Sequence, residues 1–128
     1  LSNVEQVAAI TDPPANSVDF AITALNFHDF HNSNPEAAQN ILRGIVSVLK
    51  PGGILGIIDH EGTPGADNQT LHRIAFDDAV KAVLSHGDLA LVGASDILDN
   101  PADDHTVGPF DDSLGRNTDR IVLKFIKL

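Results

Sequence analysis

Four residue types are missing from this sequence, and their absence narrows the interpretation. Cysteine, methionine, tryptophan and tyrosine do not occur among the 128 residues. Without cysteine the chain forms no disulfide bond and no thiolate metal site, which leaves the compartment open with the cytoplasm as the default expectation. No apolar run of about 18 residues is present either, so we expect no membrane-spanning helix.

Basic residues are also scarce. Eight Lys and Arg stand against 18 Asp and Glu, which gives a formal net charge of −10. An acidic domain without a basic stripe is repelled by phosphate backbones and anionic lipids, so we expect neither nucleic acid nor membrane as a partner. The apolar content of 42% is enough for one folded domain over residues 1–128. Because the chain begins with Leu1, we expect a fragment or a processed product.

The hydrophobic pattern predicts alternating strands and helices. Strands are expected over residues 3–10, 18–25, 54–59, 89–98 and 119–128. One helix should begin at Pro35 after a cap by Asn34 and end before Pro51, and a second is surest over residues 77–86. This alternation predicts an α/β fold with parallel strands, and the last two strands should pair antiparallel because no helix separates them.

The stretch "NFHDFHN" (residues 26–32) places two histidines at the end of the strand over residues 18–25. His28 and His31 are three residues apart, whereas a helical zinc pair has a spacing of four. A third metal ligand would have to come from Asp59, His60 or Glu61. Three interpretations stay open: a polar loop between strand and helix, the lining of a substrate pocket, or a metal site. We favour the first two and expect no metal.

The stretch "VDFAITAL", a helix and then "LKPGGILGIIDH" resemble the second half of the class I S-adenosylmethionine-dependent methyltransferases. The segments "IDHEG", "LHRI", "GASDILDNPADDH" and "RNTDRIVLKFIKL" further resemble a bacterial group of predicted methyltransferases. The resemblance implies a Rossmann-like sheet of strand order 3-2-1-4-5-7-6 with a C-terminal antiparallel pair. It also implies S-adenosylmethionine as cofactor and a small-molecule methyl acceptor.

One family feature is missing from the sequence. The family holds its cofactor with a glycine-rich turn after the first strand, whereas Gly52 and Gly53 follow a helix. We therefore expect this chain to be the C-terminal portion of the fold. As an isolated chain it should be incomplete and inactive. The strand from Val18 to Leu25 would have a bare edge, which predicts a homo-oligomer formed through that edge. The alternative is a non-catalytic small-molecule-binding or oligomerisation module derived from half of the fold.

Ligands of open α/β sheets bind at the carboxyl ends of the strands, and the resemblance assigns roles to the residues there. The expected catalytic residues are His28, Asp29 and His60, the cofactor-binding residues Asn26 and Phe27, and the substrate-binding residues His31, Asp59, Glu61, His72 and Arg73. For Arg73 two interpretations stay open, a pair with a surface acid or a clamp on an anionic substrate. No nucleophile elbow and no phosphate-binding loop occur, so hydrolase and kinase functions have no support.

Overall fold

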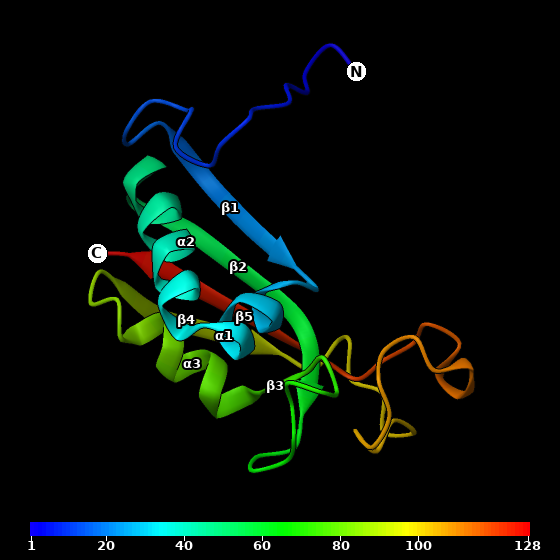
Figure 1. Cartoon of the computed structure of the whole chain (residues 1–128). Helices are drawn as coiled ribbons and strands as arrows, with labels where there is room; N and C mark the ends of the chain where they lie inside the picture. The colour runs from blue at the N-terminus through cyan, green and yellow to red at the C-terminus, as the bar shows by residue number, and fades with distance from the viewer.

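A sheet with its helices on one face organises the chain, whose computed structural model describes residues 1–128 (Figure 1). The elements in order are β1 (Val18–Ala24), α1 (Phe27–Ser33), α2 (Pro35–Val48), β2 (Leu49–Gly62), β3 (Ile74–Ala75), α3 (Phe76–Leu84), β4 (Leu89–Ser95), the 3-10 turn η1 (Asp112–Leu114) and β5 (Arg120–Lys127). The strand order is β1-β2-β5-β4, with the short β3 beside β2.

The strand pairing confirms the α/β fold class. Strand β1 is parallel to β2, and β5 is antiparallel to both β2 and β4. The expected antiparallel pair at the C-terminus is therefore present. The observed order matches the segment 4-5-7-6 of the order that the resemblance implied. Strand β1 has β2 as its one neighbour, so its other edge is bare, as expected.

Helix α2 forms as the sequence predicts. The side chain of Asn34 accepts a hydrogen bond from the N–H of Glu36 at 3.0 Å, and Pro35 occupies the first turn, where its missing N–H costs nothing. Its apolar stripe packs on the sheet: Leu42 and Ile45 join the core cluster together with Leu55 of β2. Burial of such side chains contributes roughly 1.5–3 kcal/mol each.

The opposite face of the sheet has no helix over it. Phe20 and Ile22 of β1 are 55% and 56% exposed there, beside their pairing partners Ile54 and Gly56 on β2. Sheets of this α/β type ordinarily have both faces covered. The open face is therefore an apolar surface on an otherwise acidic molecule.

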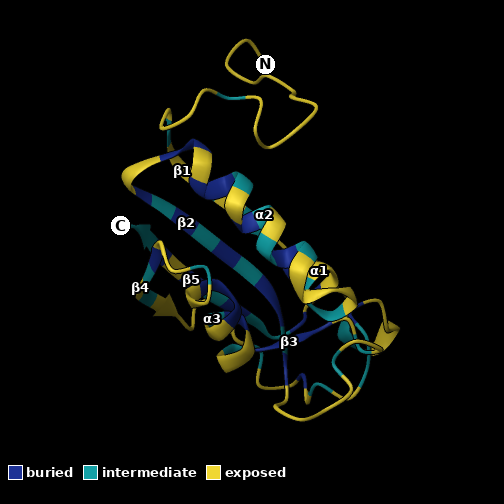
Figure 2. Cartoon of the chain, turned by 60° about the vertical axis from the view of Figure 1, so that its left-hand side comes forward, coloured by how far each residue is buried: buried dark blue, intermediate teal, exposed yellow.

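The predicted strand over residues 3–10 is wrong. Those residues form no strand, are exposed, and extend away from the sheet (Figures 1 and 2). A strand needs a neighbour to satisfy its backbone groups. No strand of the sheet pairs with residues 3–10, and the outer edge of β1 is left unpaired.

Of the interpretations left open for "NFHDFHN", the polar loop is wrong, since residues 27–33 form α1. Asn34 ends this helix in an extended conformation, which the following Pro35 favours by its clash with helical geometry at the preceding residue. Strand β2 extends beyond the predicted residues 54–59 at both ends and thereby includes His60 and Glu61.

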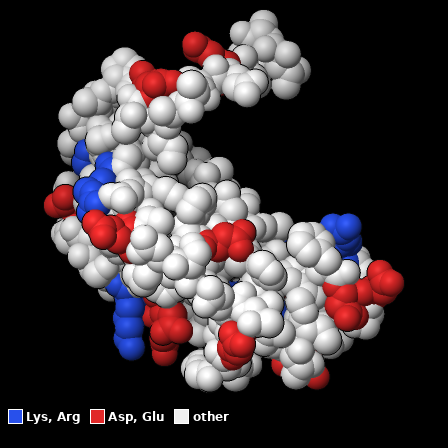
Figure 3. Space-filling view, in the orientation of Figure 1, with Lys and Arg blue, Asp and Glu red and all other residues white.

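Charge is distributed as the composition suggests. Acidic side chains are scattered over the face shown in Figure 3, and the basic ones there are few and separate. No helix of the chain is both long enough and apolar enough to cross a membrane.

Candidate functional site

The carboxyl end of β2 meets the start of α1 through a buried histidine and aspartate. The ring Nδ1–H of His28 donates to Asp59 Oδ1 at 2.6 Å, and the backbone N–H of His28 donates to Asp59 Oδ2 at 2.7 Å. Asp59 also accepts the backbone N–H of His60 at 2.9 Å. The Asp59 side chain is fully buried, so these three donors replace the water that an ionised carboxylate would otherwise need.

His28 has a second carboxylate at its other ring nitrogen. Its Nε2 lies 3.0 Å from Asp29 Oδ1, and Nδ1 of His72 lies 3.3 Å from the same oxygen. Burial by itself lowers the pKa of His28, but the hydrogen bond and charge of Asp59, together with Asp29, outweigh burial and raise it. His28 therefore holds a proton more firmly than an ordinary histidine does.

His60 is buried beside His28, with ring centroids 5.6 Å apart. Burial lowers the pKa of His60 to about 4, and the nearby positive charges of His28, Arg120 and Arg73 act in the same direction, against the opposing charge of Asp59. Its Nδ1 is 2.6 Å from the hydroxyl oxygen of Thr118, just before β5. His60 is thus neutral at physiological pH and a weak base.

Arg73 occupies the interior of the molecule rather than its surface. Its side chain is fully buried, and its guanidinium donates to Asp103 Oδ1 at 2.9 Å and to the carbonyl oxygens of Glu61 and Val107. These bonds fasten the long loop of residues 96–119 to the end of β2. We therefore assign Arg73 to holding that loop, because its guanidinium is enclosed by protein.

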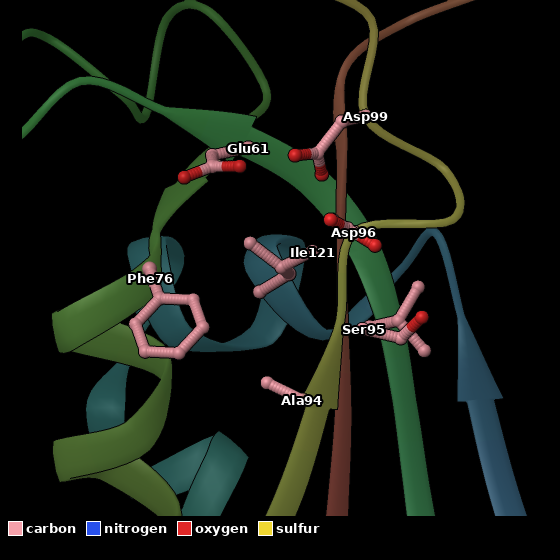
Figure 4. Close-up of a pocket in the computed structure, with 8 residues that line it drawn as sticks. Glu61, Phe76, Ala94, Ser95, Asp96, Asp99 and Ile121 are labelled. Carbon is pink, nitrogen blue, oxygen red and sulfur yellow. The ribbon is translucent and has the colours of Figure 1, made fainter.

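A cavity of about 480 Å³ opens beside this cluster, between β2, β4, β5 and the start of α3. Its lining residues are Glu61, Phe76, Ala94, Ser95, Asp96, Asp99, Ile121 and Val122. Figure 4 shows the carboxylates of Glu61 and Asp99 directed toward one another, with Phe76 on one side. Burial raises the pKa of Glu61, and the neighbouring charge of Asp119 raises it further.

The structure brings the expected residues together in two groups. His28, Asp29, Asp59, His60 and His72 form the first, and Glu61 belongs to the cavity with residues that follow β4. His31 lies apart, stacked on Phe27 with ring centroids 6.4 Å apart and facing a different cavity between α2 and α3.

The residues expected to bind the cofactor do not form a site for it in this chain. Phe27 is 1% exposed and belongs to the core, and the Asn26 amide oxygen accepts the Thr23 hydroxyl at 2.5 Å. Neither residue lines a cavity of substantial size. The residues present at the end of β1 thus do not fit S-adenosylmethionine without further protein.

Sequence reasoning missed several residues that belong to the two groups or contact the expected site residues. Thr118, Asp103 and Asp99 come from the long loop, whose path between β4 and β5 is set by tertiary contacts. The available signal was the loop's length and its density of aspartates, since long ordered loops are often functional. That signal did not say which of the aspartates would point inward.

Searches of protein-family models and of curated proteins found no match to the sequence. Solved structures do match. A SAM-dependent methyltransferase from Aquifex aeolicus aligns over 100% of this chain and 57% of its own, at 20% identity and a TM-score of 0.61. The 1,6-didemethyltoxoflavin-N1-methyltransferase of Burkholderia thailandensis, solved with S-adenosylhomocysteine, aligns over 94% and 49%, at 16% identity and a TM-score of 0.63.

A third match is named for a different reaction. The [4+2]-cyclase SpnF aligns over 96% of this chain and 54% of its own, at 18% identity and a TM-score of 0.63. The chain spans about half the length of these structures. Identities this low establish the fold, and one fold can support several chemistries. The chain therefore has the fold of part of an S-adenosylmethionine-dependent methyltransferase.

Proposed function

We propose that this chain forms the acceptor-binding part of an S-adenosylmethionine-dependent methyltransferase that acts on a small molecule. The observation that carries the proposal is the polar cavity at the carboxyl ends of the strands, the edge where ligands of open α/β sheets bind. The solved methyltransferases that match this fold support the reaction class.

The cavity suits an acceptor that carries a hydroxyl or amino group. Glu61, Asp96 and Asp99 offer hydrogen-bond acceptors to such a group, and Phe76 gives it an apolar wall. The raised pKa of Glu61 brings its carboxylate nearer to the basicity of a useful proton acceptor. Glu61 is accordingly the residue we assign to taking a proton from the acceptor.

The histidine cluster serves to position this edge. Asp59 fixes His28 and the start of α1 against β2, and His60 joins β2 to Thr118, two residues before β5. Methyl transfer depends mainly on alignment of the two reactants, so a rigid strand end contributes directly to the rate. The roles proposed for His28 and His60 are thus orientation of the site rather than proton abstraction.

We further propose that the 128-residue chain is inactive by itself, acts in the cytoplasm and pairs with a second copy along β1. The lack of a cofactor site at Asn26 and Phe27 supports inactivity. Bare, apolar strand edges favour pairing, which supports the second copy.

Two measurements test the proposal. Calorimetry with S-adenosylhomocysteine should show no submillimolar binding to the isolated chain. Saturable submillimolar binding would contradict the proposal that its cofactor site is incomplete. Nuclear magnetic resonance with small amine and hydroxyl fragments should shift resonances of residues around Glu61, and E61Q should weaken that binding. If no fragment binds while a stable oligomer forms, the alternative of an oligomerisation module replaces the proposal.

A further inference from the structure

Three metal-ligating side chains converge where α1 meets the loop before β3. Nε2 of His28 and Nδ1 of His72 lie 3.0 Å and 3.3 Å from the same oxygen of Asp29, and the three ligand atoms all lie within 4.8 Å of one another. The rings of the two histidines meet edge to face, with centroids 6.0 Å apart. His28 and Asp29 are adjacent, whereas His72 arrives from a distant part of the chain.

We propose that His28, Asp29 and His72 bind a divalent transition-metal ion such as Zn²⁺. Two histidine nitrogens and one carboxylate are a ligand set that suits this class of ion. In a tetrahedral zinc site with bonds of roughly 2.0–2.1 Å, neighbouring ligand atoms lie about 3.3 Å apart. The contacts of the two histidines with Asp29, at 3.0 and 3.3 Å, are close to that spacing, and the His72 ring is exposed.

The contact between Asp59 and His28 is an independent observation in favour of the site. Metal-bound histidines almost always donate their second ring N–H to a carboxylate or carbonyl, which fixes the ring and directs the other nitrogen to the ion. His28 donates Nδ1–H to Asp59 at 2.6 Å, and Asp59 is itself held by two backbone N–H groups. The other ring nitrogen, Nε2, lies on the side of Asp29, 3.0 Å from its Oδ1.

His72 is held in place by its neighbour. The adjacent Arg73 is fully buried, and its backbone N–H donates to the carbonyl of Asn68 at 3.0 Å while its side chain binds the long loop. The backbone that carries His72 is therefore anchored, although its ring is exposed. A ligand on an anchored backbone loses less freedom when the ion binds.

One side of the proposed site is sheltered and the other is open. The His28 side chain is 4% exposed, whereas Asp29 and His72 are 56% and 58% exposed. Three protein ligands leave a position for water or for an oxygen or nitrogen atom of a small molecule, as in zinc sites that bind substrates. The metal site can be tested independently of the proposed function, because zinc binding is measured without cofactor or acceptor.

Zinc calorimetry on the 128-residue chain at pH 7.5 tests the proposal. The wild type should bind one zinc ion saturably, above the weak background of an acidic surface, and its melting temperature should rise with zinc concentration. H72A removes an exposed ligand without disturbing the core and should weaken binding by at least about tenfold. D29N should do the same.

H86Q is the matched control, because His86 lies at the far end of α3, near the start of β4, and outside the cluster. This variant should bind zinc as the wild type does. The proposal is overturned if the wild type shows no saturable zinc binding. The three side chains would then be joined by hydrogen bonds alone. An equal loss of zinc affinity in H72A and H86Q would also overturn it, and so would an unchanged zinc affinity in H72A.

Discussion

The backbone N–H and the ring Nδ1–H of His28 both donate to the one carboxylate of Asp59, at 2.7 and 2.6 Å. This double contact connects the first turn of α1 with the end of β2, and it is buried at both partners. It fixes the ring orientation of His28 against Asp59. Both the proposed acceptor site and the proposed metal site depend on it.

The first prediction concerns Asp59. D59N replaces one acceptor oxygen with an amide and leaves a buried donor without its charged partner, so we expect the free energy of unfolding to fall by about 3 kcal/mol. Urea denaturation measures it. D19N is the matched control, because Asp19 forms an exposed pair with Lys50 that contributes at most about 1 kcal/mol. Similar losses in both variants would contradict a structural role of the buried contact.

The second prediction is a pH dependence of stability that comes from Asp103. Burial raises the pKa of this group, but the N–H groups of Asp119 and His105 and the guanidinium of Arg73 outweigh burial and lower it. Because the pKa is lower in the folded than in the unfolded chain, Asp103 stabilises the fold above its ordinary pKa of 3.8. That contribution is lost as the pH falls through the lowered pKa.

Acid denaturation of D103N tests this dependence. The variant should be less stable than the wild type at pH 7, and the gap between the two should narrow below about pH 4. D104N is the control, since Asp104 is exposed and makes only local contacts with Thr106. A constant gap between D103N and the wild type from pH 7 to pH 3 would contradict the assignment.

The third prediction concerns the crowded backbone around Gly53, within β2 and beside β1. A Cβ atom there would lie 2.8 Å from the carbonyl oxygen of Lys50 and 3.3 Å from that of Asp19, and neither backbone atom can move aside freely. G53A should therefore destabilise the fold by about 1–3 kcal/mol. G93A, at a glycine with no atom within 4 Å of the added carbon, should change thermal stability far less. Equal melting temperatures of G53A and G93A would contradict the crowding at Gly53.

The fourth prediction concerns the open edge and face at β1. If a second copy covers this strand, I22K should convert the oligomer into a monomer, because a buried lysine has no partner there. V92K is the matched control: Val92 is 52% exposed on β4, the strand at the opposite edge of the sheet. Light scattering at micromolar concentration measures the outcome. A monomeric wild type would remove the proposed second copy.

Local sequence signals predicted those elements whose stability is local. The cap at Asn34, the proline at position 35 and the apolar stripe that follows specify α2 without reference to the rest of the chain. The alternation of Ile121, Leu123 and Phe125 with more exposed neighbours likewise specified β5 and its buried face. The strand over residues 3–10 failed because a strand depends on a partner, which the sequence of one segment does not reveal.

The candidate site was predictable in part for a related reason. That His28, Asp59 and His60 come together follows from the rule that neighbouring parallel strands end at the same edge. The inward position of Arg73 did not follow, since its partner Asp103 is supplied by a loop whose path is irregular. Arginine is mostly found at the surface, so its burial is decided by the availability of a carboxylate and carbonyls inside.

By itself, the sequence determined the fold class, the order of the strands along the chain, the acidic surface and the polar residues at the strand ends, because each follows from composition or from a local periodicity. The tertiary structure alone decided that Asp29 faces both His28 and His72, that Glu61 lines a separate cavity, and that one face of the sheet is open. Most of these are relationships between residues far apart in the chain. Their distances are set by packing and buried hydrogen bonds, which no single segment encodes.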